Sequence, residues 1–210
     1  MLDNIFQKFR HNPIKKVKNQ WACKTIEGIG NVHIKTIPRA KSLRIQVKAF
    51  EGVIVTKPRS ISLKRAIDFV QTHTQWILTQ QQNAQELENR YEKLNTQFPL
   101  PIEAVAKDRI KNRLEILADF HNITYKKVSI RRQKTRWGSC SAANNINLNI
   151  HLARLPVRLM DYVILHELAH VGVKNHSEKF KRHLAILLGN VSPKILEKEL
   201  KSFGVLLLKP

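Results

Sequence analysis

Apolar and polar residues alternate along the first third of the chain and then give way to helical spacing. Between Trp21 and Thr56 the alternating runs cover residues 32–37, 43–47 and 52–56, separated by Gly, Pro and charged residues. Such runs predict a small antiparallel meander or a pair of hairpins. From residue 60 to residue 94 the apolar positions recur every three or four residues, and Ser62 is a suitable N-cap. We therefore expect a long helix, with room for a bend, after the strands.

The second half of the chain begins at a proline-containing segment, residues 95–101, which interrupts the helical pattern. A further helix is expected over residues 102–121. Alternating residues then predict strands over 126–132 and 145–152, with a turn-rich connection between them. A helix is expected to begin at Pro156 and end at Gly172. Ser177 and Ser192 are suitable N-caps for two further helices.

These elements divide the chain into three regions. Residues 1–20 form an N-terminal extension, residues 21–98 a β-rich region with its helix, and residues 99–210 the region that carries the candidate chemistry described below. The last two regions can pack as one compact unit. A length of 210 residues with 42% hydrophobic composition is enough to bury a core.

Charge adds candidate partners to this picture. The formal net charge is +21, and an excess of that size attracts polyanions, so nucleic acid and nucleoside triphosphates become candidate partners. The basic residues are nevertheless spread along the chain and match no nucleic-acid module, so they can equally be solvated faces. The oligomeric state is not indicated.

Compartment and membrane association follow from what the chain contains. Cys23 and Cys140 are its two cysteines, which favours a reducing environment over a disulfide framework. We find no apolar run typical of a signal peptide or of a membrane span. The expectation is a cytoplasmic protein that does not enter a membrane.

The pentapeptide HELAH, residues 166–170, lies near the end of the helix opened by Pro156. Positions four apart share one helix face, so His166 and His170 can reach one metal ion. Glu167 points elsewhere but can reach a water bound to that ion and act as its general base. A shuffled chain of this composition would contain the motif about 0.02 times, so chance is a weak explanation.

A catalytic zinc needs a third protein ligand and an open position for water. His176 follows His170 after a turn at Gly172 and is our candidate third ligand. Glu178 is the alternative, although an acidic residue in the first turn of the next helix is common without any metal. Zinc is the expected ion, and another divalent metal that imidazole binds is also acceptable.

The segment from Arg131 to Phe180 resembles the YgjP-like metallopeptidase domain family of predicted metal-dependent hydrolases, which is related to SprT-like and minigluzincin proteins. The matching positions are Arg132, Arg136, residues 137–140 (WGSC), Asn149, Leu152, Pro156, Asp161, Tyr162, residues 166–170 (HELAH), Asn175, His176, Ser177 and Phe180. The earlier strands and first helix also look like that family, so the resemblance covers roughly residues 30–188. Lys181 stands where the family usually has Trp.

The resemblance implies an α+β fold: a zincin-like core with a small twisted sheet beside the HExxH helix, preceded by the β-rich region and long helix. It also implies that His166, His170 and His176 hold zinc and that Glu167 is the base. Most members of the family are labelled metallopeptidases by motif, and one bacterial relative has been assigned a pyrophosphatase activity on uridine triphosphate.

The segment around WGSC offers candidate substrate or transition-state contacts. Trp137 could form the floor of a pocket, and Arg132 or Arg136 could stabilise charge on a carbonyl or phosphoryl oxygen. Equally, Trp137 can be a core residue and the arginines exposed. Asn147 and Asn149 alternate on the following strand and could either support the site or pair within the sheet.

Three functions remain open from the sequence. The first is a zinc metallopeptidase that uses metal-activated water and Glu167. The second keeps the metal site but hydrolyses a nucleoside triphosphate, which would use the basic excess, although the chain has no Gly-rich phosphate loop. The third is a nucleic-acid-associated protein with structural zinc, but structural sites are commonly closed by thiolates.

Overall fold

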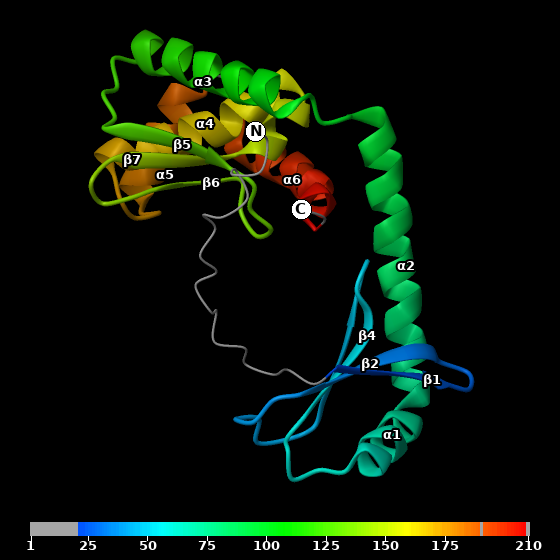
Figure 1. Ribbon diagram of the computed structural model, residues 1–210. Helices are drawn as coiled ribbons and strands as arrows, with labels where there is room; N and C mark the ends of the chain where they lie inside the picture. The colour runs from blue at the N-terminus through cyan, green and yellow to red at the C-terminus, as the bar shows by residue number, and fades with distance from the viewer. Residues whose placement is uncertain (1–20, 190, 209–210) are drawn as a thin grey trace, which may run out of the picture. The chain divides into compact units, whose positions relative to one another are not determined.

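The computed structural model describes residues 21–189 and 191–208. It is a mixed α+β structure with two small sheets and six α-helices in the described residues, so the expected α+β class is confirmed at that level. The chain forms two compact units, which meet between Ala84 and Gln85. That point lies inside helix α2 (Thr74–Gln97), whereas the sequence placed a boundary at residue 98. The difference arises because α2 is continuous, and its two ends belong to different units (Figure 1).

Unit 1 contains a four-stranded sheet in the order β1-β2-β4-β3. Its strands are β1 (Trp21–Ile26), β2 (Gly30–Thr36), β3 (Arg44–Lys48) and β4 (Gly52–Lys57). Of the two predicted arrangements, the pair of hairpins is confirmed, because β1 pairs with β2 and β3 with β4 in antiparallel. The meander is wrong, because the two hairpins join through β2 and β4 in parallel and β3 lies at the edge. Burial explains this order: β4 contributes Val53 and Val55 to the core and so takes a central place, while β3 has no fully buried residue.

Two helical segments follow the sheet of unit 1. Helix α1 (Leu63–Thr72) starts at Ser62, whose hydroxyl accepts a hydrogen bond from the Arg65 amide at 3.1 Å. The helix breaks at His73 before α2 begins, so the predicted bend is present. One face of the sheet packs against these helices through a core of buried apolar residues: Ile26, Ile29, Val32, Ile34, Val53, Val55, Val70 and Ile77.

Unit 2 contains the second sheet, of three strands in the order β5-β7-β6. The strands are β5 (Lys127–Arg131), β6 (Gly138–Cys140) and β7 (Asn145–Asn149); β5 and β7 are parallel, and β6 and β7 antiparallel. Strand β6 lies in the segment that the sequence predicted as a turn-rich connection. The strand predicted to reach residue 152 ends at Asn149, because a 3₁₀ helix, η1 (Ile150–Arg154), follows with all its residues buried.

Helices make up the rest of unit 2. They are α3 (Glu103–Phe120), α4 (Val157–Gly172), α5 (Glu178–Leu187) and α6 (Pro193–Phe203), followed by a 3₁₀ helix, η2 (Gly204–Leu207). Helix α4 contacts β6, β7 and the other three helices, so it is the centre of the unit. Ser177 and Ser192 occupy the N-cap positions as predicted, but neither side chain makes a capping hydrogen bond. Among the described helices, none combines the length and apolar character that crossing a bilayer requires.

An ion pair fixes α4 against α3. The Arg113 guanidinium donates two hydrogen bonds of 2.6 Å to the Asp161 carboxylate, from Nε to Oδ1 and from Nη2 to Oδ2. Asp161 lies in the first half of α4, one turn before His166. A two-point contact of this kind limits both sliding and rotation of the helix, so it sets where the histidines of α4 point.

Candidate metal centre

The two histidines of HELAH lie in the last turns of α4, on one face of the helix. His170 is 8% exposed and His166 is partly buried, while their neighbour Glu167 is 5% exposed on another face. This is the separation that a helical period of 3.6 residues produces. Helix α4 therefore presents two imidazoles together and directs the carboxylate between them elsewhere.

His176 completes a group of three imidazoles. Its Nε2 atom lies 3.1 Å from Nε2 of His166 and 3.2 Å from Nε2 of His170. Nitrogens bound tetrahedrally to zinc at about 2.05 Å are separated by about 3.3 Å, so the observed spacing fits a common ion. Within the described residues this is the one group of three His, Cys, Asp or Glu side chains with ligand atoms close enough to share a metal.

Glu178, the alternative ligand, and Cys140, whose thiol is a possible ligand by type, lie outside this group. Glu178 is exposed, and its carboxylate pairs with Lys181 Nζ at 2.5 Å, which lowers the pKa of Glu178 through hydrogen bonding and charge. Cys140 has a raised pKa because it is partly buried, and its thiol is approached by Lys174 Nζ at 3.7 Å. Neither side chain joins the three imidazoles.

Backbone and ring contacts orient the histidines. Nδ1 of His170 lies 3.0 Å from the Val173 carbonyl oxygen, which can only accept, so Nδ1 carries the proton and Nε2 keeps its lone pair. Phe180, 2% exposed, packs against all three rings, with centroid distances of 5.0 Å to His166, 4.3 Å to His170 and 4.9 Å to His176. The ring of Phe180 thus supports the side of the site nearest α5.

Burial also favours the neutral form of His166 and His170, which metal binding requires. It lowers the pKa of His166 to about 4, and the neighbouring His170 and His176 act in the same direction. The pKa of His170 is also lowered, first by burial. Nε2 of His176 lies 3.1 Å and 3.2 Å from the other two Nε2 atoms, close enough for one cation to bind all three. The residues present therefore fit a divalent metal ion.

Glu167, the residue after His166 in α4, carries a buried and unsatisfied carboxylate. Its Oε2 atom has no hydrogen-bond partner in the described part of the chain. Burial raises the pKa of Glu167 to about 7, and the positive charge of Arg136 partly opposes that rise. A carboxyl group with a pKa near neutrality can both accept and release a proton at physiological pH, which is what a general base that later acts as an acid requires.

Strand β6 touches this carboxylate through Gly138. A Cβ atom at Gly138 would lie 2.7 Å from Oε1 and 2.8 Å from Cγ of Glu167, so only glycine fits without displacing the side chain. The loop before β6 is held by Asn149, which is fully buried: its side-chain amide donates to the carbonyls of Gln133 and Arg136, both at 2.8 Å. Asn149 therefore supports the site through this loop, one of the two roles left open by the sequence.

The arginines of the loop lie in different surroundings. Arg136 is exposed and acts electrostatically on Glu167. The charge of Arg132 acts instead on His151 and Arg154, away from the three histidines. Trp137 is half-buried, and its carbonyl accepts a hydrogen bond from the Asn149 amide at 2.8 Å. Of the two arginines, Arg136 is the one whose charge acts on Glu167.

A hollow of about 540 Å³ opens beside the histidines. Its apolar wall comes from Tyr162, Phe180, Leu184 and Pro193, and His166 and His176 form one side of it. Lys181, Lys194 and Glu197 add charged groups. The site therefore has space for a mainly apolar group of a substrate next to the three imidazoles.

Some contributors to the site could not be found from local sequence patterns. The carbonyl of Val173 is a backbone group, and the approach of Gly138 to Glu167 joins a strand to a helix about 30 residues later in the chain. Phe180 could be found only as a matching position in the family resemblance. Its apolar character alone indicates a core residue.

Comparisons with known proteins found one family and two solved structures. The sequence model described as YgjP-like, metallopeptidase domain, matches residues 41–104 and 88–203. No curated protein matched the chain. Two solved structures are similar. The first is the metallopeptidase zymogen of Pyrococcus abyssi abylysin, with 24% identity and a TM-score of 0.41, and the match covers 45% of this chain and 93% of that chain. The second is the metallopeptidase zymogen of Methanocaldococcus jannaschii jannalysin, with 25% identity and a TM-score of 0.40, and the match covers 45% of this chain and 95% of that chain.

Proposed function

The chain belongs to the YgjP-like metallopeptidase domain family and is a metal-dependent hydrolase, and we propose that it is a zinc metallopeptidase with Glu167 as its general base. His166, His170 and His176 would hold the ion. The observation that carries the proposal is the convergence of three imidazole Nε2 atoms at a helix that also holds, at Glu167, a buried carboxylate whose Oε2 is unpaired in the described part of the chain. Three imidazoles with an open fourth position are typical of catalytic rather than structural zinc.

The roles of the metal, the water and Glu167 follow from where each group binds or releases a proton. When bound, the metal polarises the carbonyl of the scissile bond and lowers the pKa of water toward about 7. Glu167 would take the proton from the attacking water and deliver it to the leaving amine, because its buried carboxylate has an unpaired Oε2 and burial raises its pKa above the usual range for a carboxyl group. Gly138 leaves room for the Glu167 carboxylate, because a Cβ atom there would lie 2.7 Å from Oε1.

The surroundings of the site favour a peptide over a nucleotide. The hollow beside the histidines has a mainly apolar wall, which suits an apolar peptide side chain better than a triphosphate. Arg136 lies within electrostatic reach of Glu167 and is suited to stabilise negative charge that develops on a carbonyl oxygen. The substrate is thus a polypeptide with an apolar residue next to the cleaved bond.

The test compares two variants in adjacent positions of α4. Glu167→Gln should keep one zinc per chain, measured by elemental analysis, and lose peptide-cleaving activity by about a thousandfold. His166→Ala should lose both the metal and the activity. The assay uses a mixed peptide library with mass-spectrometric detection of cleavage. A Glu167→Gln protein with full activity would reject the assigned role.

The nucleotide alternative is separated by a parallel assay. The same protein, loaded with zinc, is incubated with each common nucleoside triphosphate, and pyrophosphate release is measured. We expect none. Pyrophosphate release that depends on His166 and Glu167, together with no cleavage in the peptide library, would show that this site hydrolyses phosphoanhydride bonds instead of peptide bonds.

A further inference from the structure

The sheet of unit 1 has two unlike faces. One face forms the apolar core with α1 and α2. The opposite face, which we call the open face, presents side chains that are exposed or half-buried and include no Asp or Glu. By strand register its members are Trp21, Cys23, Thr25, Asn31, His33, Lys35, Arg44, Gln46, Lys48, Ile54 and Thr56.

One row of the open face joins an aromatic ring to cations. Trp21, Lys35, Thr56 and Arg44 lie directly opposite one another on the four adjacent strands. Trp21 is 54% exposed, and Lys35 Nζ lies over its ring at 5.1 Å from the centroid. With neighbouring strands about 4.8 Å apart, the row spans about 14 Å from the indole to Arg44. It offers a stacking surface at one end and positive charge along its length.

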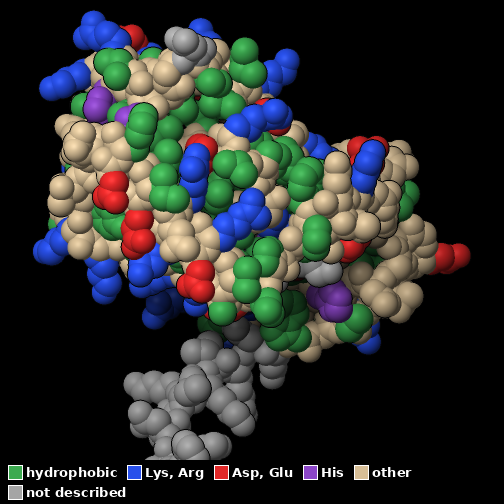
Figure 2. All heavy atoms as spheres, turned by 90° about the horizontal axis from the view of Figure 1, so that it is seen from above, with side chains coloured by type: hydrophobic (Ala, Val, Ile, Leu, Met, Phe, Trp, Pro, Cys, Tyr) green, Lys and Arg blue, Asp and Glu red, His purple; other side chains and the backbone are tan. Residues whose placement is uncertain are grey.

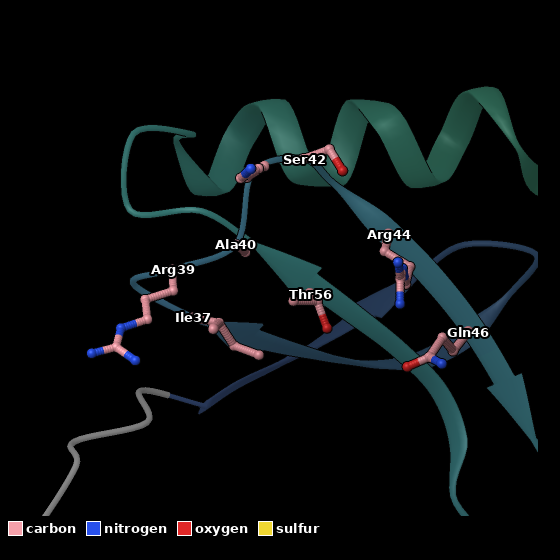
Figure 3. Close-up of a pocket in the computed structure, with 8 residues that line it drawn as sticks. Ile37, Arg39, Ala40, Ser42, Arg44, Gln46 and Thr56 are labelled. Carbon is pink, nitrogen blue, oxygen red and sulfur yellow. The ribbon is translucent and has the colours of Figure 1, made fainter.

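The end of the row at Arg44 opens into a hollow of about 440 Å³. Figure 3 shows Arg44, Gln46 and Thr56 on neighbouring strands around it, with Arg39 at the opposite end. Lys41 and Ser42 also line the hollow, and no acidic side chain does. Within the described part of the chain, none of Arg39, Lys41 and Arg44 takes part in an ion pair.

Three cations without counter-charges around one hollow favour binding of an anion. The charge of the surrounding unit adds to this, because residues 21–84 contain ten Lys and Arg against three Asp and Glu. Glu51 is already paired with Lys48 at 3.1 Å. Figure 2, by contrast, shows a face of the molecule on which basic and acidic side chains are intermixed. The hollow, which three cations and no acidic side chain line, therefore differs from a surface of mixed charge.

We propose that the open face of unit 1 binds single-stranded nucleic acid. Phosphates lie on Arg39, Lys41 and Arg44, and an unpaired base stacks on Trp21. Proteins bind single strands with aromatic rings and cations on one surface, because each base offers a flat face for stacking and each nucleotide carries a negative charge. A duplex keeps its bases stacked inside and cannot use the indole. This role is separate from peptide hydrolysis and does not depend on it.

The experiment measures binding of a fluorescent 20-nucleotide oligothymidine to the full chain by anisotropy, over a range of salt concentrations. The variant R39Q/K41Q/R44Q should weaken binding at least tenfold and reduce the slope of log K against log salt by about 2, as expected for three lost phosphate contacts. The matched control R59Q/K64Q/R65Q removes the same charge from the same unit outside the hollow. It should retain most of the affinity and slope. Equal losses in both variants would overturn the assigned surface.

A second pair of variants tests the aromatic contact. Trp21→Leu should weaken binding about tenfold with little change in the salt slope, because stacking releases no counterions. Trp76→Leu removes the other strongly exposed tryptophan of unit 1, 46% exposed on α2, and should bind as the unchanged protein does. Quenching of tryptophan fluorescence by the oligonucleotide should disappear in the first variant and persist in the second.

Competition decides the chemical class of the partner. Unlabelled single-stranded DNA or RNA should displace the probe at lower concentrations than a duplex of equal length or an acidic peptide such as polyglutamate. Stronger displacement by duplex, or by polyglutamate, would reject the proposal. So would the absence of binding at low salt. The variant Glu167→Gln should bind as tightly as the unchanged protein, which separates this result from any failure of the peptidase assay.

Discussion

The two units of this protein use a small sheet in different ways. In unit 2 the sheet supports a buried centre: β6 contacts the Glu167 carboxylate, and α4 brings two imidazoles to a third. In unit 1 the sheet buries one face and leaves the other with exposed polar and basic side chains. The buried centre depends on close packing in three dimensions, whereas the open face depends mainly on strand register. Substitutions should therefore affect the two units differently.

Truncation of an aromatic residue should show the largest difference in stability loss between the two units. Phe180→Ala removes a ring that is 2% exposed and touches all three histidines, so unit 2 should lose about 3–5 kcal/mol of stability. Trp21→Leu in unit 1 replaces a side chain that is 54% exposed, and its effect should stay within about 0.5 kcal/mol. Urea denaturation followed by circular dichroism measures both.

The same measurement has a control inside unit 2. Phe120 is 77% exposed, so Phe120→Ala should be nearly neutral although it removes the same ring. A loss at Phe120 as large as that at Phe180 would mean that burial does not separate the two positions. The comparison between a packed centre and an open surface would then fail.

Buried polar groups should make unit 2 sensitive to acid. His151 is 2% exposed, and burial lowers its pKa from 6.5 to about 4, with the charges of Arg154 and Arg132 acting in the same direction. Between these two values the unfolded chain binds the proton and the folded chain does not, so folding stability falls as pH decreases from about 6.5 to about 4. The loss amounts to roughly 3 kcal/mol once the pH has fallen to about 4.

His151→Asn should flatten that dependence. Asparagine does not titrate, and its oxygen can accept a hydrogen bond from Arg154, which lies near Nδ1 of His151. Denaturation curves between pH 4 and pH 7 give the slope for both proteins. A slope unchanged by the substitution would show that acid sensitivity comes from other groups.

A single methyl group at the contact between β6 and α4 should impair catalysis more than folding. Gly138→Ala places a carbon against the Glu167 carboxylate, which must then move, and a misplacement of this size can reduce turnover by about 100-fold. Zinc content should remain at one per chain because no histidine is displaced. Activity and elemental analysis on one preparation test this expectation, and loss of the metal would contradict it.

Gly204→Ala is the matched control, since a Cβ atom there meets no other atom within 4 Å. Its activity should equal that of the unchanged protein. In unit 1, Gly28, Gly30 and Gly52 have positive φ angles of 75°, 89° and 73°, so alanine at those positions strains the backbone without any contact. The two units therefore require glycine for different physical reasons.

The sequence predicted that three imidazoles come together because their arrangement is local. The spacing of His166 and His170 follows from helix geometry, and His176 follows shortly after the helix ends at Gly172. The resemblance to a known family strengthened this prediction. Helix starts at Ser62 and Pro156 and the bend near His73 were also predictable, since caps and apolar spacing depend on neighbouring residues.

Contacts between distant segments were not predictable in the same way. Strand β6 was missed because three residues are too few for an alternating pattern, and it exists through its pairing with β7. The parallel pairing of β2 and β4 was missed because local alternation does not state which strands become neighbours. The role of Asn149 is likewise visible only when the loop that it holds is in place.

Ion pairs should show the smallest difference between the units. Arg113 and Asp161 join α3 to α4 by two bonds of 2.6 Å, with side chains 32% and 20% exposed, whereas Lys48 and Glu51 in unit 1 share one contact of 3.1 Å and are 45% and 48% exposed. Double-mutant cycles should give a coupling energy of about 1 kcal/mol for the first pair and less than about 0.5 kcal/mol for the second. Two bonds in a fixed plane lose less freedom on pairing than one flexible lysine contact. If Arg113→Lys keeps the full coupling, charge alone holds α4 in place, and the two-point geometry does not orient its histidines.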